Sequence, residues 1–316
     1  MKGLKKAVKM IRQARDIAIT CHVNPDGDAI GSMLSLGLGL EKLGKKVYMV
    51  SRDGVPKKYR RLRGARRVRK KLDKKVDLGV TVDCSTAEMV GGVFTFLERT
   101  GSILEVDHHE IRAPFGDAQL IDTRAAAVGE MVYVLLKRLG VKPTKDIAEN
   151  ILTSLIVETC SFRLPNVTPF TFKVCEAMLR AGVDFYRLVD TVYWSHTREV
   201  AVLSGVCMSR LKFAARGRLA WSVIKREDFH KAGGKDEDVD AVPDEIRAIK
   251  GVDIAVLFRE TDRHSIRVSL RSKGSINVAK LAALFGGGGH ADVSGCRIPN
   301  RQDSMKKLLA RARELL

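Results

Sequence analysis

The sequence lacks any apolar run near the length of a membrane span. A helix that crosses a bilayer needs about 20 consecutive apolar residues, and the apolar runs of this 316-residue chain are much shorter. The first residues mix apolar and basic side chains, and charges continue through Lys9, Arg12 and Arg15. We interpret this segment as an amphipathic helix rather than a signal peptide. We therefore expect a cytoplasmic protein with no membrane partner.

The sequence also lacks closely spaced cysteines. Its cysteines are scattered and form no Cys-x-x-Cys pair, which argues against a zinc knuckle. Buried thiols in a reducing compartment are the better interpretation. The six cysteines are Cys21, Cys84, Cys160, Cys175, Cys207 and Cys296.

Acidic residues are few compared with basic ones, 37 against 56, so the formal net charge is +19. Much of the excess lies between residues 57 and 75, at Lys57, Lys58, Arg60, Arg61, Arg63, Arg66, Arg67, Arg69, Lys70, Lys71, Lys74 and Lys75. Such a stretch suits a polyanionic partner, because binding phosphates releases counterions. A solvated helical face is the alternative. Tyr59 is the only aromatic residue in the stretch, so base stacking has little support there.

Three short apolar runs are each followed by acidic or imidazole side chains. They are residues 17–21 before His22, Asp26 and Asp28, residues 78–82 before Asp83, and residues 101–106 before Asp107, His108 and His109. Each run is typical of a short buried strand. In an open parallel sheet, ligands bind at the carboxyl ends of the strands. We therefore expect these polar side chains to meet in one cleft.

Mixed imidazole and carboxylate ligands favour Mn, Fe or Zn over Ca or Mg. A shared carboxylate can hold two ions about 3.5–4 Å apart, the arrangement used for in-line displacement at phosphorus. Each of these motifs, taken alone, also has a simpler interpretation. Asp26-Gly27 is an ordinary turn pair, Asp83 is placed to cap a helix at residues 87–98, and a His-His pair is often on the surface. The joint pattern favours a metal centre.

Strand-like and helix-like segments alternate through the first half, which is typical of a parallel α/β sheet. We predict strands at 17–21, 46–50, 78–82 and 101–106, and helices at 29–43, 87–98, 125–139 and 147–157. From 169 to about 210 the pattern is mostly helical. Strands at 219–225, 254–258 and 265–270 and a helix at 278–285 follow. We expect an α/β domain at 1–185, a helical linker at 186–210 and a smaller α/β domain at 211–316.

Four successive glycines, Gly286 to Gly289, follow the last of these helices. Glycine lets backbone N–H groups approach an anion and point together. His290 adds a donor, and Arg271 adds a charged fork that suits phosphate or carboxylate. No Gly-Lys-Ser/Thr ending follows, so a nucleotide P-loop is excluded. A phosphate-binding loop and a plain turn both remain open from these residues alone.

These motifs together, in their order, resemble the DHH phosphoesterase superfamily. The resemblance rests on His22-x-x-x-Asp26-x-Asp28 with Ala29-Ile30-Gly31-Ser32, on Asp83, on Asp107-His108-His109, and on Arg271-Ser272-Lys273 with the glycine tract and His290. It covers nearly the whole chain. It implies an N-terminal parallel-sheet DHH domain that binds metal, joined by helices to a DHH-associated substrate-binding domain. The oligoribonuclease (nanoRNase) and 3'-phosphoadenosine-5'-phosphate phosphatase group is the most similar part of the superfamily.

The resemblance implies a role for each site residue. His22, Asp26 and Asp83 would hold one ion, and Asp28, Asp83, His108 and Glu158 the other. Asp83 would bridge the ions, and Asp107 and His109 would orient the ligands or assist proton transfer. Arg271, Ser272, Gly288, Gly289 and His290 would bind the substrate. Two Mn²⁺ ions are expected, with Mg²⁺ or Co²⁺ as alternatives.

The chain departs from the family pattern at its fourth motif. There the family has Asp-Thr-Gly, and this sequence has Glu158-Thr159-Cys160. Glu158 keeps the carboxylate on a longer side chain, and Cys160 replaces a glycine that allows unusual backbone angles. The departure makes it an open question how Glu158 affects the second ion.

The expected function is a manganese-dependent phosphohydrolase acting on short single-stranded RNA or DNA, or on 3'-phosphoadenosine-5'-phosphate. Within the superfamily, a phosphodiesterase of cyclic or linear dinucleotides and a RecJ-like exonuclease remain open. A type II inorganic pyrophosphatase is disfavoured because its C-terminal domain lacks the glycine tract. A catalytically impaired nucleic-acid or nucleotide-binding protein is the alternative of a different class. The sequence does not fix the oligomeric state, and a homodimer stays open.

Overall fold

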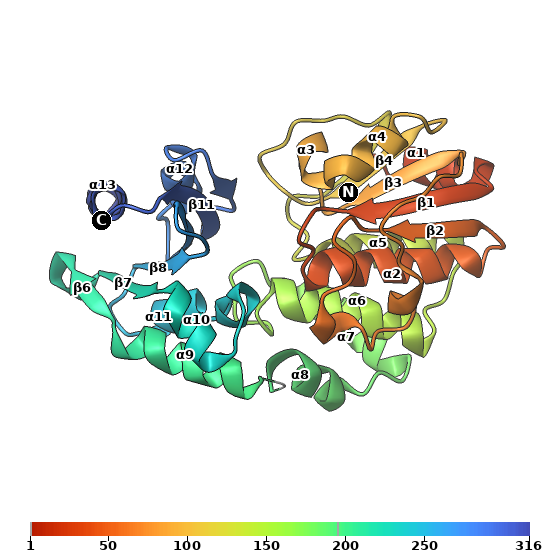
Figure 1. Ribbon diagram of the computed structural model, residues 1–316. Helices are drawn as coiled ribbons and strands as arrows, with labels where there is room; N and C mark the ends of the chain where they lie inside the picture. The colour runs from red at the N-terminus through yellow and green to blue at the C-terminus, as the bar shows by residue number, and fades with distance from the viewer. Residues whose placement is uncertain (1, 195) are drawn as a thin grey trace. The chain divides into compact units, whose positions relative to one another are not determined.

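The computed structural model describes residues 2–194 and 196–316, which form two compact units (Figure 1). Unit 1 spans Met1–Ser195 and unit 2 spans His196–Leu316. Each unit has its own sheet and its own buried apolar clusters. Within the described ranges, we find no helix that combines the length and the apolar character needed to cross a membrane.

The sheet of unit 1 has five parallel strands in the order β2-β1-β3-β4-β5. The strands are β1 (Asp16–Cys21), β2 (Lys46–Val50), β3 (Leu78–Val82), β4 (Ile103–Asp107) and β5 (Ala118–Ile121). The sequence predicts the first four and misses β5, which is only four residues long. Because all pairs are parallel, the carboxyl ends of the strands lie together at the same end of the sheet.

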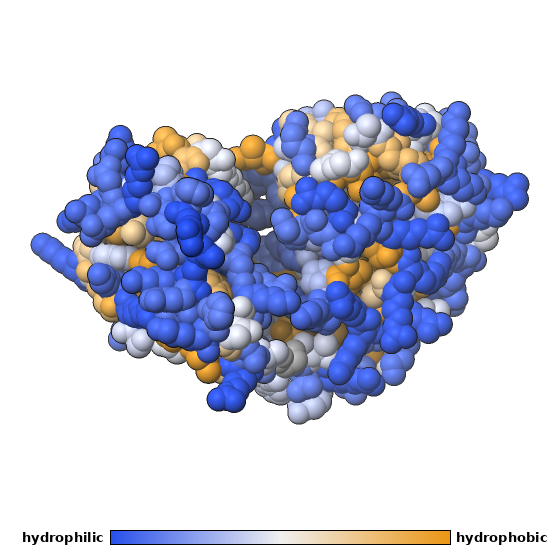
Figure 2. All heavy atoms as spheres, viewed as in Figure 1, coloured by the Kyte–Doolittle hydropathy of each residue, from blue (hydrophilic) through white to orange (hydrophobic). Residues whose placement is uncertain are grey.

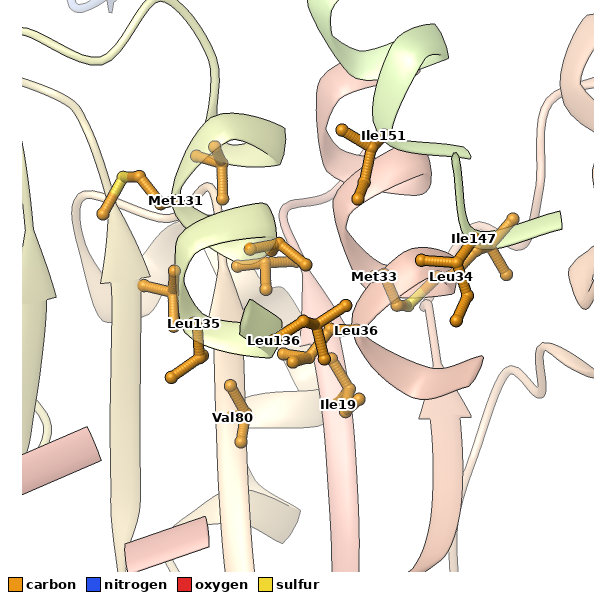
Figure 3. Packing of buried hydrophobic residues seen from close by; sticks show 14 of the residues in the cluster. Ile19, Met33, Leu34, Leu36, Val80, Met131, Leu135, Leu136, Ile147 and Ile151 are labelled. Carbon is orange, nitrogen blue, oxygen red and sulfur yellow. The ribbon is translucent and has the colours of Figure 1, made fainter. Parts of the chain in front are cut away.

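Helices cover both faces of this sheet. They are α1 (Leu4–Gln13), α2 (Gly27–Glu41), α3 (Ala87–Val90), α4 (Phe94–Leu97), α5 (Val128–Leu139), α6 (Lys145–Glu158), α7 (Pro169–Arg180) and α8 (Phe185–Tyr193). Ile17 and Ile19 of β1 pack into the cluster that contains α2, α5 and α6 (Figure 3). The intervening Ala18 packs into a smaller cluster on the other face, with residues from α3 and α4. This alternation follows from the two-residue period of a strand.

Helices α2 and α6 pack closely at a glycine. A side chain at Gly31 would place its first carbon 2.4 Å from the carbonyl oxygen of Asn150 in α6, far inside van der Waals contact. The close approach matters for the site, because α2 carries Asp28 in its first turn and α6 ends at Glu158. The glycine therefore helps to set the distance between two predicted metal ligands.

Some predicted helices differ in the structure. The single helix predicted at 87–98 is divided into α3, a 3₁₀ turn at Gly91–Val93 and α4, because Gly91 has a φ of +64° that ends the first helix. The basic stretch forms no α-helix. It contains 3₁₀ turns at Lys57–Tyr59 and Ala65–Arg67, so its exposed cations lie on turns and loops rather than on one face of an α-helix.

Unit 2 is built on a six-stranded sheet in the order β10-β11-β9-β8-β7-β6, in which β7 and β8 pair in parallel and the other pairs are antiparallel. The strands are β6 (Lys212–Ala214), β7 (Leu219–Ile224), β8 (Ile254–Glu260), β9 (Ser265–Ser272), β10 (Gly288–Gly289) and β11 (Val293–Pro299). The sequence predicts β7, β8 and β9 and misses the other three.

The helices of unit 2 lie on both faces of its sheet. They are α9 (Arg198–Ser209), α10 (Arg226–Ala232), α11 (Val242–Ala248), α12 (Val278–Ala283) and α13 (Gln302–Glu314). One apolar cluster joins the sheet to α12 and α13, and another joins it to α9 and α11. Of the helices in the expected linker at 186–210, α8 packs into the core of unit 1 and α9 into that of unit 2. Hydrophilic side chains cover most of the visible surface of both units (Figure 2).

Replacing Gly31 with alanine is expected to destabilise the protein. The added carbon meets backbone rather than a movable side chain, and such overpacking costs about 1–3 kcal/mol. The midpoint of thermal unfolding falls by about 2–4 °C per kcal/mol in a domain of this size, which calorimetry measures. Gly205→Ala in α9 is the control, because nothing lies within 4 Å of the added carbon. Equal melting temperatures for both variants would contradict the close α2–α6 contact.

Candidate metal centre

The predicted ligands lie just beyond three neighbouring strands of unit 1. His22 follows β1, Asp83 follows β3, and His108 and His109 follow β4. Since β1, β3 and β4 are adjacent in the sheet, their carboxyl ends bring these side chains together. The structure thus places the strand-end residues as the sequence pattern predicts.

Asp83 lies at the centre of the cluster. Its carboxylate oxygens are 3.6 Å from Nε2 of His22, 3.8 Å from Nε2 of His108 and 3.7 Å from Nδ1 of His109. The residue has a φ of +60°, a conformation that costs energy in a residue with a side chain. It does not cap α3, whose N-cap is Thr86. The cap interpretation of Asp83 is therefore wrong.

Three further carboxylates surround the two histidines. Asp26 lies 3.9 Å from Nε2 of His22. Asp28 and Glu158 lie 3.8 and 3.9 Å from Nε2 of His108. These contacts join α2 and the end of α6 to the strand ends.

Hydrogen bonds to the backbone set the orientation of two imidazoles. Nδ1 of His22 lies 2.8 Å from the carbonyl oxygen of Val23, and Nδ1 of His108 lies 3.0 Å from that of Ala125. In each ring the Nδ1–H donates to this carbonyl in the neutral form. The lone pair of Nε2 then faces the carboxylates, which is the arrangement of a metal-binding histidine.

The spacing of these groups suits metal ions better than direct contacts. The separations of 3.6–3.9 Å from Nε2 of His22 and His108 to the carboxylates are too long for hydrogen bonds. Nitrogen and oxygen ligands lie about 2.0–2.2 Å from a transition-metal ion, so two ligands of one ion are separated by at most about 4.4 Å. Two groups of three residues have all their ligand atoms within 4.8 Å of one another: His22, Asp26 and Asp83, and Asp83, His108 and His109.

The electrostatics also point to missing positive charge. Burial and the carboxylates of Asp28, Asp26 and Asp83 hold the pKa of Glu158 well above its usual value. Burial and Asp83 raise the pKa of Asp28 to about 6. Burial lowers the pKa of His22, but Asp26 and Asp83 outweigh it and raise that pKa to about 12. A cation held between these groups would favour their charged forms, and these residues fit a metal centre.

Asp28 is held by Ser32 of its own motif and by two residues that the sequence pattern does not single out. Its fully buried carboxylate accepts hydrogen bonds from the hydroxyls of Ser32 and Ser154, at 2.9 and 2.6 Å, and from the backbone N–H of Val128 at 2.9 Å. Ser154 lies on α6 and Val128 begins α5. No signal in the sequence links residues so far apart, and their contact arises from the packing of α2, α5 and α6.

Asp107 lies behind the cluster. It accepts a hydrogen bond of 2.7 Å from Nδ1 of His109, and its other oxygen lies 3.2 Å from Nε of Arg112. Arg112 in turn forms an ion pair with the buried Glu105. The chain of contacts positions His109, and the sequence analysis missed Arg112 and Glu105.

Glu158, the last residue of α6, is followed by an unusual turn. Cys160, Ser161 and Phe162 all have positive φ, at +46°, +57° and +63°. This is the left-handed region that favours glycine, so Cys160 occupies a conformation suited to the glycine of the family motif. The strained turn ends α6 directly beside the cluster.

The predicted substrate-binding residues lie together in unit 2, at one end of the β10-β11-β9 part of its sheet. Nε of Arg271 pairs with Asp244 at 3.1 Å. Ser272 is buried, and its hydroxyl donates to the carbonyl oxygen of Ile276 at 2.6 Å. Arg271 is therefore held in an ion pair, and Ser272 fixes the local backbone.

The glycine tract folds against β11. A side-chain carbon at Gly287 would lie 2.1 Å from the carbonyl oxygen of Gly295, and one at Gly289 would lie 2.5 Å from that of Val293. These two glycines are thus needed for close packing of the backbone. Gly288 is exposed and has open space beside it. His290 follows directly, and its N–H donates to the carbonyl of Val293 at 2.7 Å.

Comparison with known proteins agrees with this geometry. The family model of the DHH family N-terminal domain matches residues 16–157, and that of the DHHA1 domain matches residues 217–316. The chain is 32% identical to the bifunctional oligoribonuclease and PAP phosphatase NrnA of Thermus thermophilus, over 89% of this chain and 84% of that protein.

Solved structures show the same fold. An exopolyphosphatase-related protein from Bacteroides fragilis superposes with a TM-score of 0.92 at 24% identity, over 99% of this chain and 95% of that one. RecJ from Thermus thermophilus in complex with Mn²⁺ superposes with a TM-score of 0.56 at 16% identity, over 99% of this chain and 54% of that one. Both family models, the relative at 32% identity and the cluster of histidines and carboxylates at the strand ends agree. The chain therefore belongs to the DHH phosphoesterase superfamily.

Proposed function

We propose that this protein is a manganese-dependent phosphohydrolase that degrades short oligonucleotides, dephosphorylates 3'-phosphoadenosine-5'-phosphate, or does both. The observation that carries the proposal is the convergence of three histidines on the carboxylate of Asp83, with three more carboxylates around them. The names of similar proteins support the substrate class, since NrnA of Thermus thermophilus is an oligoribonuclease and PAP phosphatase.

The ligands divide into two sets that share Asp83. His22 and Asp26 would complete the first site, and Asp28, His108 and Glu158 the second. Mixed imidazole and carboxylate ligands favour Mn²⁺. Ions held by these ligands would lower the pKa of a coordinated water molecule and would so supply a nucleophile at neutral pH.

The protein's own residues do the rest. The buried hydrogen bonds to Asp28 and the backbone bonds to His22 and His108 hold the ligands in place before the substrate arrives. His109, oriented by Asp107, lies beside the cluster where it could carry a proton to the leaving oxygen. In unit 2, the distal phosphate or the terminal nucleotide would be bound by Arg271, Ser272, Gly288, Gly289 and His290. Ser272 would act indirectly, by holding the local backbone in place.

The proposal is tested by initial rates with a diribonucleotide, 3'-phosphoadenosine-5'-phosphate and a linear guanosine dinucleotide, each with Mn²⁺, Co²⁺ and Mg²⁺. Hydrolysis of the diribonucleotide or of the bisphosphate, fastest with Mn²⁺, is the expected result. Binding without turnover under every condition would indicate a nucleotide-binding protein instead. Turnover of the guanosine dinucleotide alone would place the protein with the dinucleotide phosphodiesterases.

Asp83→Ala should abolish hydrolysis while the protein stays folded. One carboxylate serves both sites, so its loss disrupts the whole centre, and even milder damage to a metal site costs about 10–100-fold. Initial rates at saturating Mn²⁺ and circular dichroism measure the two outcomes. Asp190→Ala, on the exposed surface of α8, should leave the rate unchanged. A rate above about one tenth of wild type in Asp83→Ala would refute the shared-ligand assignment.

Affinity for Mn²⁺ should rise with pH between 6 and 8.5. Despite its burial, neighbouring carboxylates raise the pKa of His22 to about 12, and burial with nearby carboxylates raises the pKa of Glu158, so the metal-free protein favours the protonated forms of these ligands. Ion binding must release protons from such ligands, and this release becomes more favourable as the proton concentration falls with rising pH. Calorimetric titration in two buffers with different ionisation enthalpies measures the protons released. A pH-independent dissociation constant without proton release would contradict the account.

Glu158→Asp should lower the rate at limiting Mn²⁺, and high Mn²⁺ should recover part of it. The shorter side chain draws the carboxylate away from the second site, and mass action refills a weakened site. A Mn²⁺ titration of the initial rate measures the shift. Glu158→Gln, which keeps the length but loses the charge, should be rescued less. If the titration curve of Glu158→Asp matched that of wild type, Glu158 would not be a ligand.

A further inference from the structure

The basic stretch at residues 57–75, here called the basic segment, exposes its cations to solvent. All twelve of its lysines and arginines are exposed, and Asp73 is its single acidic residue. Among the described residues, three of these cations form ion pairs: Arg63 with Asp146, Arg67 with Glu41, and Lys74 with Asp16. The rest leave a strong positive charge on one part of unit 1.

The basic segment is anchored, although it contains no α-helix. Tyr59, Leu62, Ala65 and Leu72 are buried between the cations. The backbone of Arg69 pairs with the edge strand β2, donating to the carbonyl of Met49 at 3.0 Å and accepting from the N–H of Ser51 at 2.9 Å. The charges are therefore carried on a fixed scaffold, so a partner can bind them without first ordering the segment.

The basic segment also reaches the metal centre. The hydroxyl of Tyr59 would lie 2.8 Å from a side-chain carbon at Gly27, the residue between the candidate ligands Asp26 and Asp28. From this point the segment runs over α6, where the carbonyl of Arg63 accepts from the side chain of Asn150 at 3.1 Å, and then to β2. Tyr59 thus anchors the segment beside the candidate ligands, while Arg63, Arg67 and Lys74 pair farther away, with Asp146 of α6, Glu41 of α2 and Asp16 of β1.

We propose that the basic segment binds the sugar-phosphate backbone of single-stranded nucleic acid longer than a dinucleotide, whose end lies at the metal centre. This inference rests on the proposed function and narrows its substrate class. Exposed lysines and arginines contact phosphates at any sequence, and Tyr59, the segment's only aromatic residue, is buried, so base stacking does not select the sequence. A single strand fits because the central ligands are recessed, with the side chains of His108 and Asp83 only 9% and 6% exposed.

The test compares two variants of equal charge change. Lys57→Gln/Arg61→Gln/Arg66→Gln removes three exposed cations of the basic segment. Lys5→Gln/Lys9→Gln/Arg12→Gln removes three exposed cations from α1, which contacts β5 at the opposite edge of the sheet. Initial rates are measured for a diribonucleotide and for a 12-nucleotide single-stranded RNA, and anisotropy of the labelled 12-mer is followed from 50 to 200 mM salt.

The basic-segment variant should raise the KM for the 12-mer on the order of tenfold and lower the salt slope of binding by about 2, since each phosphate contact on a single strand contributes about 0.7. Its rate with the diribonucleotide, and both rates of the α1 variant, should stay within about twofold of wild type. Equal losses on both substrates, no loss on either, or equal losses in the two variants would each overturn the proposal. So would a 12-base-pair duplex that binds as tightly as the single strand.

The anisotropy measurement separates this inference from the proposed function. If the wild-type protein hydrolysed neither substrate, the proposed function would fail. Binding of the labelled 12-mer that weakens in the basic-segment variant and not in the α1 variant would still support the nucleic-acid surface. Hydrolysis of the diribonucleotide without salt-dependent binding of the 12-mer would support the proposed function and overturn the nucleic-acid surface.

Discussion

Repulsion among buried carboxylates is the constraint on which the site depends. Four carboxylates lie 3.6–3.9 Å from Nε2 of His22 or His108, namely those of Asp26, Asp28, Asp83 and Glu158. Asp28 and Asp83 are buried, and Asp26 and Glu158 are partly buried. Burying acids without compensation is costly, and the raised pKa values of Asp28 and Glu158 are the expected consequence. A bound divalent cation would relieve it. The fold therefore keeps together a group of charges that a bound divalent cation would stabilise.

The scaffold resists this repulsion through backbone contacts and close packing. Asp28 is fixed by two serine hydroxyls and the start of α5, and the glycine at position 31 brings α2 against α6. Asp83 and residues 160–162, just beyond Glu158, adopt positive φ angles. Strain of this kind persists where the surrounding structure enforces it, and it often accompanies function. Here it lies at the proposed bridging ligand itself and in the turn that follows α6.

The sequence predicts the part of the site that follows strand periodicity. His22, Asp83 and His108 stand directly after apolar runs, and adjacent parallel strands bring such positions together. The strands β5, β6, β10 and β11 escaped prediction because they are short or, like β11, carry polar residues and glycine. Ser154 and Arg112 escaped because their roles depend on helix packing and on a contact chain that no local pattern encodes.

In unit 2, the glycine tract indicates an unusual backbone conformation, but the sequence does not show what that conformation serves. Gly287 and Gly289 permit close contact with β11, which the sequence could not distinguish from an anion-binding loop. The pairing of Arg271 with Asp244 was equally hidden, since the partners come from β9 and α11. A phosphate that binds Arg271 must therefore compete with Asp244 or add to it.

The central claim is that Asp83 is shared between two metal ions. Anomalous diffraction from crystals grown with Mn²⁺ tests it most directly. The account predicts two peaks about 3.5–4 Å apart, one beside His22 and Asp26 and the other beside Asp28, His108 and Glu158, with the carboxylate of Asp83 between them. A single peak, or peaks that leave Asp83 outside the coordination of either ion, would contradict it.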